Sequence, residues 1–300
     1  MRDITYQIYS HVEIDNWSVG AWPDMRIHST KQWEFAPASS AAVRRSGGNT
    51  VTSFRELVRK VAEVAIYNPR LYPLFRGQNE DYLNKAGSSK IYPLIYRPPA
   101  GKSRLTHNAI LHRVNYLDAV LKALRAHFRS HPSLLTDHRE YWWSLLQHYE
   151  LAKTPLLDLT QNLRLAATFA LSERSAVPWG ARRSGYVFVL GLPHPPACLS
   201  PLVDEQMVIV RLQSVCPPEA LRPHFQEGFL IGRWPRSTRK LKGDNAAYRM
   251  IDKFRLDNSD GTFWDDGFNP IPESVIYPSN DPFARSLAEA IRAVALPPPP

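Results

Sequence analysis

Apolar residues at helical spacing predict amphipathic helices in the first half of the chain. Large apolar side chains follow steps of three and four over residues 110–128, which predicts a helix that ends before Pro132. A second apolar stripe begins behind Ser53 and Glu56, whose S-x-x-E spacing is that of a capping box. We expect this helix to end at Asn68, which precedes a proline.

Other helices are predicted from shorter patterns. Residues 141–149 and 163–170 each carry apolar residues at helical spacing, and Thr160 is the expected N-cap of the second segment. A final helix is predicted after Asp281, with Asp281 as its cap and Pro282 at its first position.

Short runs of β-branched and other apolar residues predict strands. These runs are residues 71–78, 156–160, 185–190, 207–212, 225–231 and 274–277. Helices are expected early and strands late, without regular alternation, so the sequence predicts an α+β fold with a mixed or antiparallel sheet. We expect an N-terminal extension over residues 1–50, one domain over 51–295 and a proline tail over 296–300.

The composition is that of a globular protein with a basic charge. Of 300 residues, 44% are hydrophobic and 22% charged, which excludes disorder as the main state. The formal net charge of +9 favours anionic partners such as nucleic acid, nucleotides or phosphates. The basic run over residues 233–242 has two interpretations, a solvated loop or a contact with phosphate or nucleic acid.

The sequence lacks the patterns of several classes of protein. Residues 1–6 contain no apolar segment of a signal peptide, and prolines interrupt the apolar stretch over 185–203, so we expect a cytoplasmic protein without a membrane partner. The two cysteines cannot form a disulfide framework or a cysteine-based zinc site. His127 and His131 are four residues apart, but no Glu or Asp joins them at the spacing of metal ligands, so we expect no metal site. Motifs of dinucleotide folds, P-loops and α/β-hydrolases are absent from the sequence.

Two short segments carry candidate chemistry. Arg76 and Gly77 follow a predicted strand, where a guanidinium beside exposed backbone amides suits a diphosphate. Alternatively, Arg76 is structural and pairs with a carboxylate such as Asp158. His148 has three interpretations: a donor to a phosphate or ribose hydroxyl, a base, or a buried side chain bonded to a carbonyl. We expect Asp158 to orient Arg76 or His148.

These segments resemble the FRG domain family. The resemblance rests on F-R-G-Q at residues 75–78, Q-H-Y at 147–149, L-L-D-x-T at 156–160 and an alanine-rich helix that follows. It continues with a G-x-V strand at 185–187 and spans about residues 51–295. The loop after Q-H-Y is one residue longer than in the family, and Leu159 stands where a tryptophan is usual. The family is linked to bacterial defence and toxin-like settings.

The order of motifs is also similar to that of R-S-E type ADP-ribosyltransferases. This resemblance implies that NAD is the substrate, that Arg76 grips its diphosphate or ribose and that Thr160 steadies the site. Glu227, or alternatively Gln226, takes the place of the catalytic glutamate on a late strand, where only one of the two can face the site. The implied catalytic residues are Glu227, Arg76 and His148, and the implied NAD-binding residues are Arg76, Gly77, Gln78, Tyr149, Asp158 and Thr160. Tyr149, Tyr186 and Phe229 are candidates to stack on nicotinamide.

Three functions remain open at this point. The first is NAD-dependent ADP-ribosyl transfer to a protein or nucleic acid by a toxin-like or defence-associated effector, with an antitoxin or other regulator as an expected partner. The second is a non-catalytic module that binds a nucleotide or nucleic acid. The third is a structural or sensing domain in which the motifs only hold the core. If Arg76, His148, Asp158 and Thr160 line one open cleft with an acidic group across it, an enzyme is favoured.

Overall fold

The protein is described from a computed structural model. The structure describes residues 8–11, 35–99, 102, 105–129, 135–174, 178–234, 245–264, 267–292 and 294. The expected proline tail, most of the expected N-terminal extension and most of the basic run over 233–242 lie outside these residues.

The described residues form a mixture of helices and strands, so the α+β prediction is confirmed. The strands are β1 (Ile8–His11), β2 (Phe35–Ala38), β3 (Asn49–Val51), β4 (Tyr72–Gln78), β5 (Leu156–Thr160), β6 (Ser184–Leu192), β7 (Leu199–Leu202), β8 (Met207–Arg211), β9 (Gly228–Arg233) and β10 (Met250–Asp257). The helices are α1 (Ser40–Arg45), α2 (Phe54–Tyr67), α3 (His107–His127), α4 (Arg139–His148), α5 (Leu163–Leu171), α6 (Leu212–Val215), α7 (Leu221–Gln226), α8 (Glu273–Ile276) and α9 (Pro282–Arg292), with 3-10 turns η1 (Leu94–Tyr96) and η2 (Ala246–Arg249).

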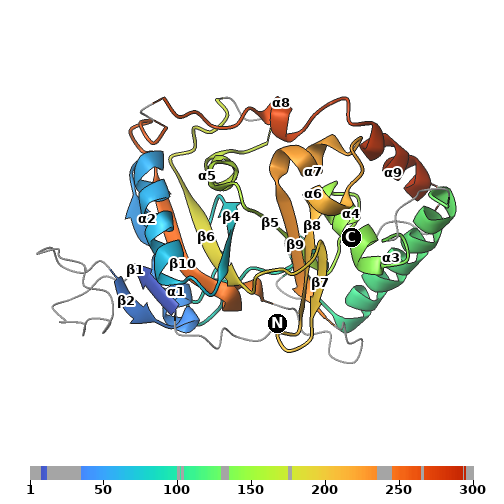
Figure 1. Ribbon diagram of the computed structural model, residues 1–300, viewed down its shortest axis with the longest axis horizontal. Helices are drawn as coiled ribbons and strands as arrows, with labels where there is room; N and C mark the ends of the chain where they lie inside the picture. Colours follow the sequence, from blue (N-terminus) through green and yellow to red (C-terminus); the bar gives the residue numbers. More distant parts are fainter. Residues whose placement is uncertain are drawn as a thin grey trace, which may run out of the picture.

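The main sheet consists of two halves that part from each other in the middle (Figure 1). Its eight strands lie in the order β3-β10-β6-β4-β5-β9-β8-β7, and it is mixed because β3 is parallel to β10 while the other pairs are antiparallel. Strand β4 pairs with β6 from Tyr72 to Gln78, but with β5 at a single position, Phe75 opposite Thr160. The two central strands therefore diverge beyond this position.

Each half of the sheet has its own helices, whereas the two hydrophobic cores are divided by the faces of the sheet: Ile209 and Ile231 of β8 and β9 belong to one core, and Val208 and Leu230 of the same strands belong to the other. Helices α2 and α5 pack against the half that contains β4, β6 and β10, whereas α3, α4 and α9 cover the other half (Figure 1). Residues of β5 alternate between the two cores: Leu157 and Leu159 belong to the first and Leu156 to the second. Asp158 therefore shares the face of Leu156, on which α4 lies.

Close contact between α5 and the sheet explains two glycines. A Cβ atom at Gly77 would lie 1.8 Å from the carbonyl oxygen of Ala166, and one at Gly185 would lie 2.1 Å from that of Ala170. Small residues on both sides thus let the backbone of α5 lie directly on β4 and β6. The missing side chain of Gly77 therefore makes room for α5, and the close approach of a phosphate to this glycine stays a prediction.

Replacing Gly77 by alanine is expected to destabilise the fold by at least about 3 kcal/mol, because α5 must move away from β4 and its buried contacts are lost. Urea unfolding checks this value. Gly47→Ala is the control, because a Cβ atom at Gly47 would have no other atom within 4 Å and should change stability little. Gly87→Ala is less suitable, because Gly87 has a positive φ that strains an alanine. Equal stability of the Gly77 and Gly47 variants would contradict the packing argument.

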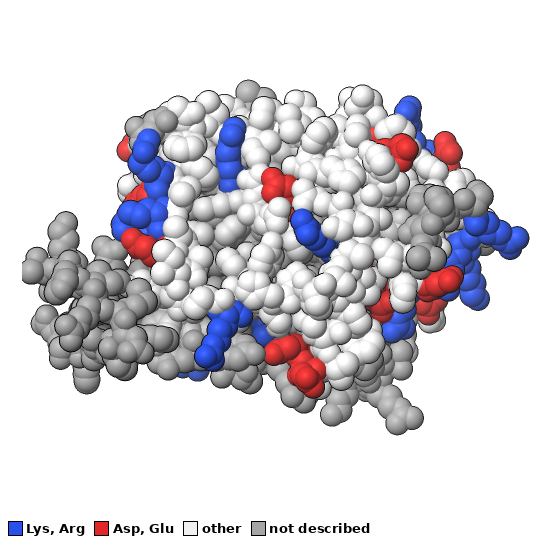
Figure 2. Space-filling model, in the orientation of Figure 1, with Lys and Arg blue, Asp and Glu red and all other residues white. Residues whose placement is uncertain are grey.

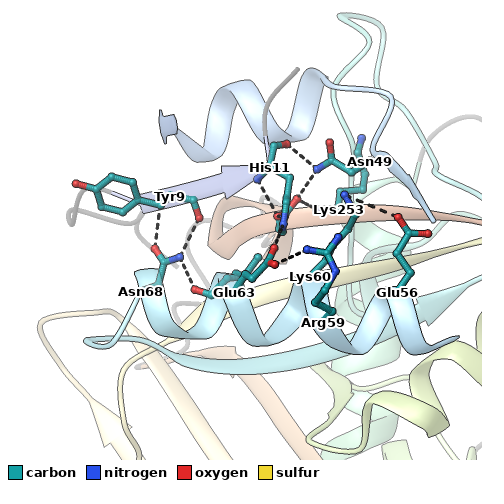
Figure 3. A network of polar contacts seen from close by, with 11 residues as sticks. Tyr9, His11, Asn49, Glu56, Arg59, Lys60, Glu63, Asn68 and Lys253 are labelled. Atoms are coloured by element: carbon teal, nitrogen blue, oxygen red, sulfur yellow. Dashed lines mark hydrogen bonds and ion pairs between the residues drawn. The ribbon is translucent and has the colours of Figure 1, made fainter. Parts of the chain in front are cut away.

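A buried polar network joins β1, β3 and α2 to β10 (Figure 3). Nδ1 of His11 lies 2.7 Å from Oδ2 of Asp252, and its Nε2 lies 3.1 Å from Oε2 of Glu63. The side-chain amide of Asn49 donates to Oδ1 of Asp252 at 3.0 Å. The backbone N–H of Lys253 also donates to Oδ1 of Asp252. Asp252 is 1% exposed, so this carboxylate is the buried centre of the network.

The Asp252→Ala variant is expected to lose about 3 kcal/mol of stability, because it removes the buried acceptor of the His11 ring and of the backbone N–H groups of His11 and Lys253. Chemical denaturation of this variant beside Asp118→Ala, an exposed aspartate on α3, measures the effect. The account of the network fails if the two variants unfold at the same denaturant concentration.

Most predicted elements are confirmed, and three predictions are wrong. Residues 225–231 are not one strand, because Gln226 ends α7 and Glu227 has a left-handed φ of 46° before β9 begins. Residues 274–277 are not a strand, because most of them belong to α8. The N-cap of α5 is Asn162, whose side chain accepts from the N–H of Leu165; Thr160 instead accepts from the N–H of Asn162.

Strand β10 was not predicted, although it is central to its half of the sheet. The capping box of α2 and the N-cap role of Asp281 in α9 are as expected, since Ser53 and Asp281 each accept the hydrogen bond of a cap. In the part of the chain that the structure describes, no helix is both long and apolar enough to cross a membrane.

Candidate functional site

A cleft of about 430 Å³ lies beside the point where β4 and β5 part. Its lining combines the ends of β4 and α4, the middle of β5 and parts of the loops around them. The residues that line it are Arg76, Gly77, Gln78, Asn79, Tyr82, Leu94, Arg97, Gln147, His148, Glu150, Leu157, Asp158, Phe169, Ser172, Glu173, Arg174, Trp179, Arg222, Gln226 and Tyr277. The volume is within the usual range of small-ligand sites.

Arg76 spans the gap between the two diverging strands. Its Nη1 donates to the backbone carbonyl of Asp158 at 2.7 Å, and its Nε donates to Oε1 of Gln78 at 2.9 Å. Asp158 lies two residues from Thr160, so its carbonyl points toward β4, where strand pairing has ended. Arg76 thus satisfies an acceptor left open by the parting strands, and the expected ion pair with the Asp158 carboxylate is not formed.

Arg97 brings a second positive charge to the same cleft. Its backbone carbonyl accepts from Nη1 of buried Arg113 at 2.7 Å, as does that of Ile95 at 2.9 Å. The Nε of Arg97 donates to the carbonyl of Tyr92 at 2.7 Å. Arg113 thereby fixes the turn that carries Arg97.

The pKa values of these two guanidinium groups show that they are poorly solvated. Burial and then the charge of Arg97 lower the pKa of Arg76 to about 10, and burial lowers the pKa of Arg97. Among the described side chains, the hydrogen-bond acceptors of both are neutral groups. Two desolvated like charges without a bound carboxylate are a favourable site for an anion.

The two other arginines of the cleft differ because they share one carboxylate, which compensates one of their two positive charges. Oε2 of Glu150 accepts from Arg174 at 2.8 Å, and Oε1 accepts from Arg222 at 2.6 Å. Both guanidinium groups lie over the ring of Tyr277, at 4.5 and 4.7 Å from its centroid. This cluster forms part of the cleft wall, whereas the hydrogen bonds of Arg76 and Arg97 to described residues go to neutral acceptors.

His148 and Asp158 form a hydrogen-bonded pair beside Arg76. Nδ1 of His148 lies 3.1 Å from Oδ1 of Asp158. Gln147 donates to Oδ2 of Asp158 at 2.9 Å and accepts from Thr154 Oγ1 at 2.9 Å. The Nε2 atom of His148 is buried and has no partner among the described residues.

The charge state of Asp158 decides the chemistry of this pair. Burial alone would raise the pKa of Asp158, but the hydrogen bond and charge of His148, with Arg76 and Gln147, hold it below its ordinary value. An ionised carboxylate only accepts hydrogen bonds, so Nδ1 of His148 carries a proton. In the neutral ring Nε2 then has a free electron pair and can accept a proton.

The structure brings some of the expected site residues together and separates others. Arg76, Gly77, Gln78, His148 and Asp158 line the cleft, and Thr160 lines a smaller cavity next to it. Gln226 lines both cavities and donates to the carbonyl of Ile276 at 2.9 Å.

Glu227 and Tyr149 are outside the lining of both cavities. The carboxylate of Glu227 accepts from Asn162 at 2.8 Å and from Gln161 at 3.0 Å, in the turn between β5 and α5. The hydroxyl of Tyr149 donates to Asp281 at 2.8 Å, and burial raises its pKa. Tyr186 and Phe229 do not line the cavities either, so none of the three expected stacking residues does.

Sequence reasoning missed the residues that loops contribute. Arg97, Arg174, Glu150 and the aromatic residues Tyr82, Phe169, Trp179 and Tyr277 line the cleft. None lies in a motif that the resemblance used, apart from Phe169 in the alanine-rich helix. These residues are spread from residue 82 to residue 277, so the sequence contains no local signal that groups them.

Comparison with protein families identifies the part of the chain that builds this cleft. The model of the FRG domain matches residues 73–177. Residues 73–177 of this chain are therefore recognised as an FRG domain. No curated protein and no solved structure matches it.

The FRG match contains most residues of the cleft. Arg76, Arg97, His148 and Asp158 all lie inside it, whereas Arg222, Gln226 and Tyr277 lie beyond its end. The wider extent over residues 51–295 stays a prediction. Within the FRG segment, the motif residues contact one another. The side chains of Gln147 and His148 form hydrogen bonds with the carboxylate of Asp158, and Arg76 donates to the backbone carbonyl of Asp158. Gly77 leaves the space in which the backbone of α5 lies.

The distribution of charge bears on the expected nucleic-acid partner. On the face drawn in Figure 2, Lys and Arg side chains are scattered, lie mostly toward the edges and alternate with Asp and Glu. Among the described residues drawn on this face, the basic side chains therefore form no continuous patch of the kind that follows a nucleic-acid backbone. Within the described residues, no three or more His, Cys, Asp or Glu side chains form a group that can hold a metal ion.

Proposed function

We propose that the FRG-domain protein binds NAD in the cleft between β4 and β5 and cleaves its nicotinamide–ribose bond, transferring the ADP-ribosyl group. One observation carries the binding half of this proposal: Arg76 and Arg97 are desolvated and bound only to neutral acceptors in the cleft. A diphosphate supplies the negative charge that these two groups lack.

The rest of the cleft suits the other parts of a dinucleotide. Four aromatic side chains line it, those of Tyr82, Phe169, Trp179 and Tyr277, and such rings stack on heterocyclic bases. Choosing NAD among nucleotides depends on the similarity to ADP-ribosyltransferases, in which a strand with arginine lies beside a strand with a small hydroxyl residue. Here β4 with Arg76 adjoins β5 with Thr160 in the same way.

Cleavage requires stabilisation of an oxocarbenium-like ribose by a nearby carboxylate. Glu227 was the expected carboxylate, but its oxygens are bonded to Gln161 and Asn162. We assign this role to Asp158, which faces the cleft with one third of its side chain exposed, and the role of base to His148. An acceptor group loses its proton to Nε2 of His148 as it attacks C1′ of the ribose, and nicotinamide leaves with the electron pair of the broken bond.

The position of Glu227 favours a second candidate function. If cleavage needs a glutamate in the cleft, which Gln226 does not supply and Glu227 does not reach, the cleft can bind a nucleotide but not cleave it, and the protein is a binding module. A toxin-like or defence-associated role, with an antitoxin or other regulator, follows only from the family resemblance. Toxicity on expression that Arg76→Ala abolishes would support such a role.

Nicotinamide release from NAD by the purified full chain tests the proposal. We expect release by the wild type and by Glu227→Gln, and none by Arg76→Ala, with all three folded by circular dichroism. Loss of release in Glu227→Gln would restore that residue as the catalytic carboxylate. Binding of NAD without release would support the binding module, and absence of both would contradict the proposal.

A further inference from the structure

A small second cavity adjoins the cleft behind Arg76. Its volume is about 50 Å³, and its lining includes Arg76, His148, Asp158, Thr160 and Gln226. A cavity needs roughly 10–15 Å³ to hold a water molecule, and a bound water needs two to four polar partners. The volume and the polar lining both meet this requirement.

The imidazole of His148 supplies the strongest reason for a bound molecule here. His148 is 3% exposed, and its Nε2 is buried without a hydrogen-bond partner among the described residues. Leaving a buried polar nitrogen unsatisfied costs about 1–3 kcal/mol. Nδ1 is already engaged by Asp158, so a donor that reaches this ring must do so at Nε2.

The burial of Nε2 also limits the size of the acceptor that it can serve. His148 lines both the cleft and the small cavity, but its Nε2 atom is closed to solvent. A side chain of a folded protein or a base of a nucleic acid would have to displace the residues around this atom to approach it, so we expect only a very small molecule to donate its proton to Nε2.

We propose that this cavity holds the nucleophilic water of a hydrolase, and that the FRG domain transfers ADP-ribose to water and not to a macromolecule. This inference rests on the proposed cleavage of NAD. The water gives one proton to Nε2 of His148 while its oxygen forms a bond to C1′ of the ribose. The bond from C1′ to the nicotinamide nitrogen breaks, and its electron pair leaves with neutral nicotinamide. The products are ADP-ribose, nicotinamide and one proton, which His148 releases to solvent.

Product analysis in the presence of competing acceptors tests this assignment. The full chain is incubated with NAD, a mixture of polypeptides, and single- and double-stranded oligonucleotides. We expect nicotinamide and free ADP-ribose in equal amounts and no ADP-ribose on the added macromolecules. Methanol, which is small enough for the cavity, is expected to give methyl ADP-ribose, whereas isobutanol is not. ADP-ribose attached to a polypeptide or oligonucleotide would overturn the inference while the proposed cleavage stands.

A variant of His148 separates this inference from binding. His148→Gln keeps a polar group at the cavity but removes the base, and we expect hydrolysis to fall about a hundredfold or more while the Kd for ADP-ribose stays within about twofold. His112→Ala, at an exposed position of α3, is the matched control. Hydrolysis at the wild-type rate by folded His148→Gln would overturn the inference. Absence of any NAD binding by the wild type would contradict the proposed function as well.

Discussion

Asp158→Asn is expected to lower the rate of NAD cleavage about a thousandfold without weakening NAD binding. The reason is the fixed orientation of Gln147, whose Oε1 accepts from Thr154 and whose Nε2 donates to Oδ2 of residue 158. An asparagine must therefore turn its oxygen to Gln147 and its NH₂ group to His148. Nδ1 of His148 then has to accept, the proton moves to Nε2, and the base is lost.

Steady-state rates and calorimetric titration with ADP-ribose measure the two parts of this prediction. Asp118→Asn, an exposed aspartate on α3, is the control for the loss of one charge. The neighbours hold the pKa of Asp158 below its ordinary value of 3.8, so the wild-type carboxylate stays ionised above that pH and protonates only as the pH falls further. A wild-type cleavage rate in Asp158→Asn would contradict the assigned pair.

Arg76→Met is expected to weaken NAD binding about a hundredfold or more while leaving the melting temperature at least equal to that of the wild type. Burial and the charge of Arg97 both disfavour the Arg76 guanidinium in the unliganded protein. The methionine removes the unfavourable free energy of the buried charge, although the two hydrogen bonds of Arg76 are lost. It also removes the positive charge that would have paired with the diphosphate of the ligand.

Thermal unfolding and titration with NAD, carried out on the same samples, test whether stability is kept while affinity for NAD falls. Arg255→Met, at an exposed position of β10, should change neither. Because the pKa of Arg76 is about 10, wild-type affinity for NAD should fall as the pH rises through that value and the guanidinium loses its proton. A marked loss of stability in Arg76→Met with unchanged affinity would assign Arg76 a purely structural role.

The sequence predicted the elements whose residues follow one regular period. Helix α3 carries apolar residues at regular helical steps and β6 contains a continuous apolar run, and both were predicted close to their true bounds. Strand β10 was missed because Asp252 and Lys253 interrupt its apolar residues. Both are buried, since His11 and Asp81, distant in the sequence, pair with them.

The turn before β9 shows a different limit of sequence reasoning. An unbroken strand through Gln226 and Glu227 was expected, but Glu227 adopts a left-handed conformation that favours glycine, and no residue type signals it there. Consequently Gln226 lines the cleft and Glu227 does not.

The sequence predicted only some of the residues that come together in the cleft. The motifs indicated that Arg76, His148 and Asp158 belong together, and all three line the cleft. Arg97 was missed because it lies in a loop and Arg113, in a separate helix, holds it there by backbone carbonyls. Such long-range contacts leave no periodic pattern in the sequence.

The central claim is that the paired guanidiniums of Arg76 and Arg97 bind the diphosphate of NAD. Calorimetric titration of the wild-type chain with ADP and with adenosine, which differs from ADP by the diphosphate alone, tests it most directly. The account predicts that ADP binds at least about a hundredfold more tightly than adenosine. Equal affinity for the two ligands, or no detectable binding of ADP, would contradict it.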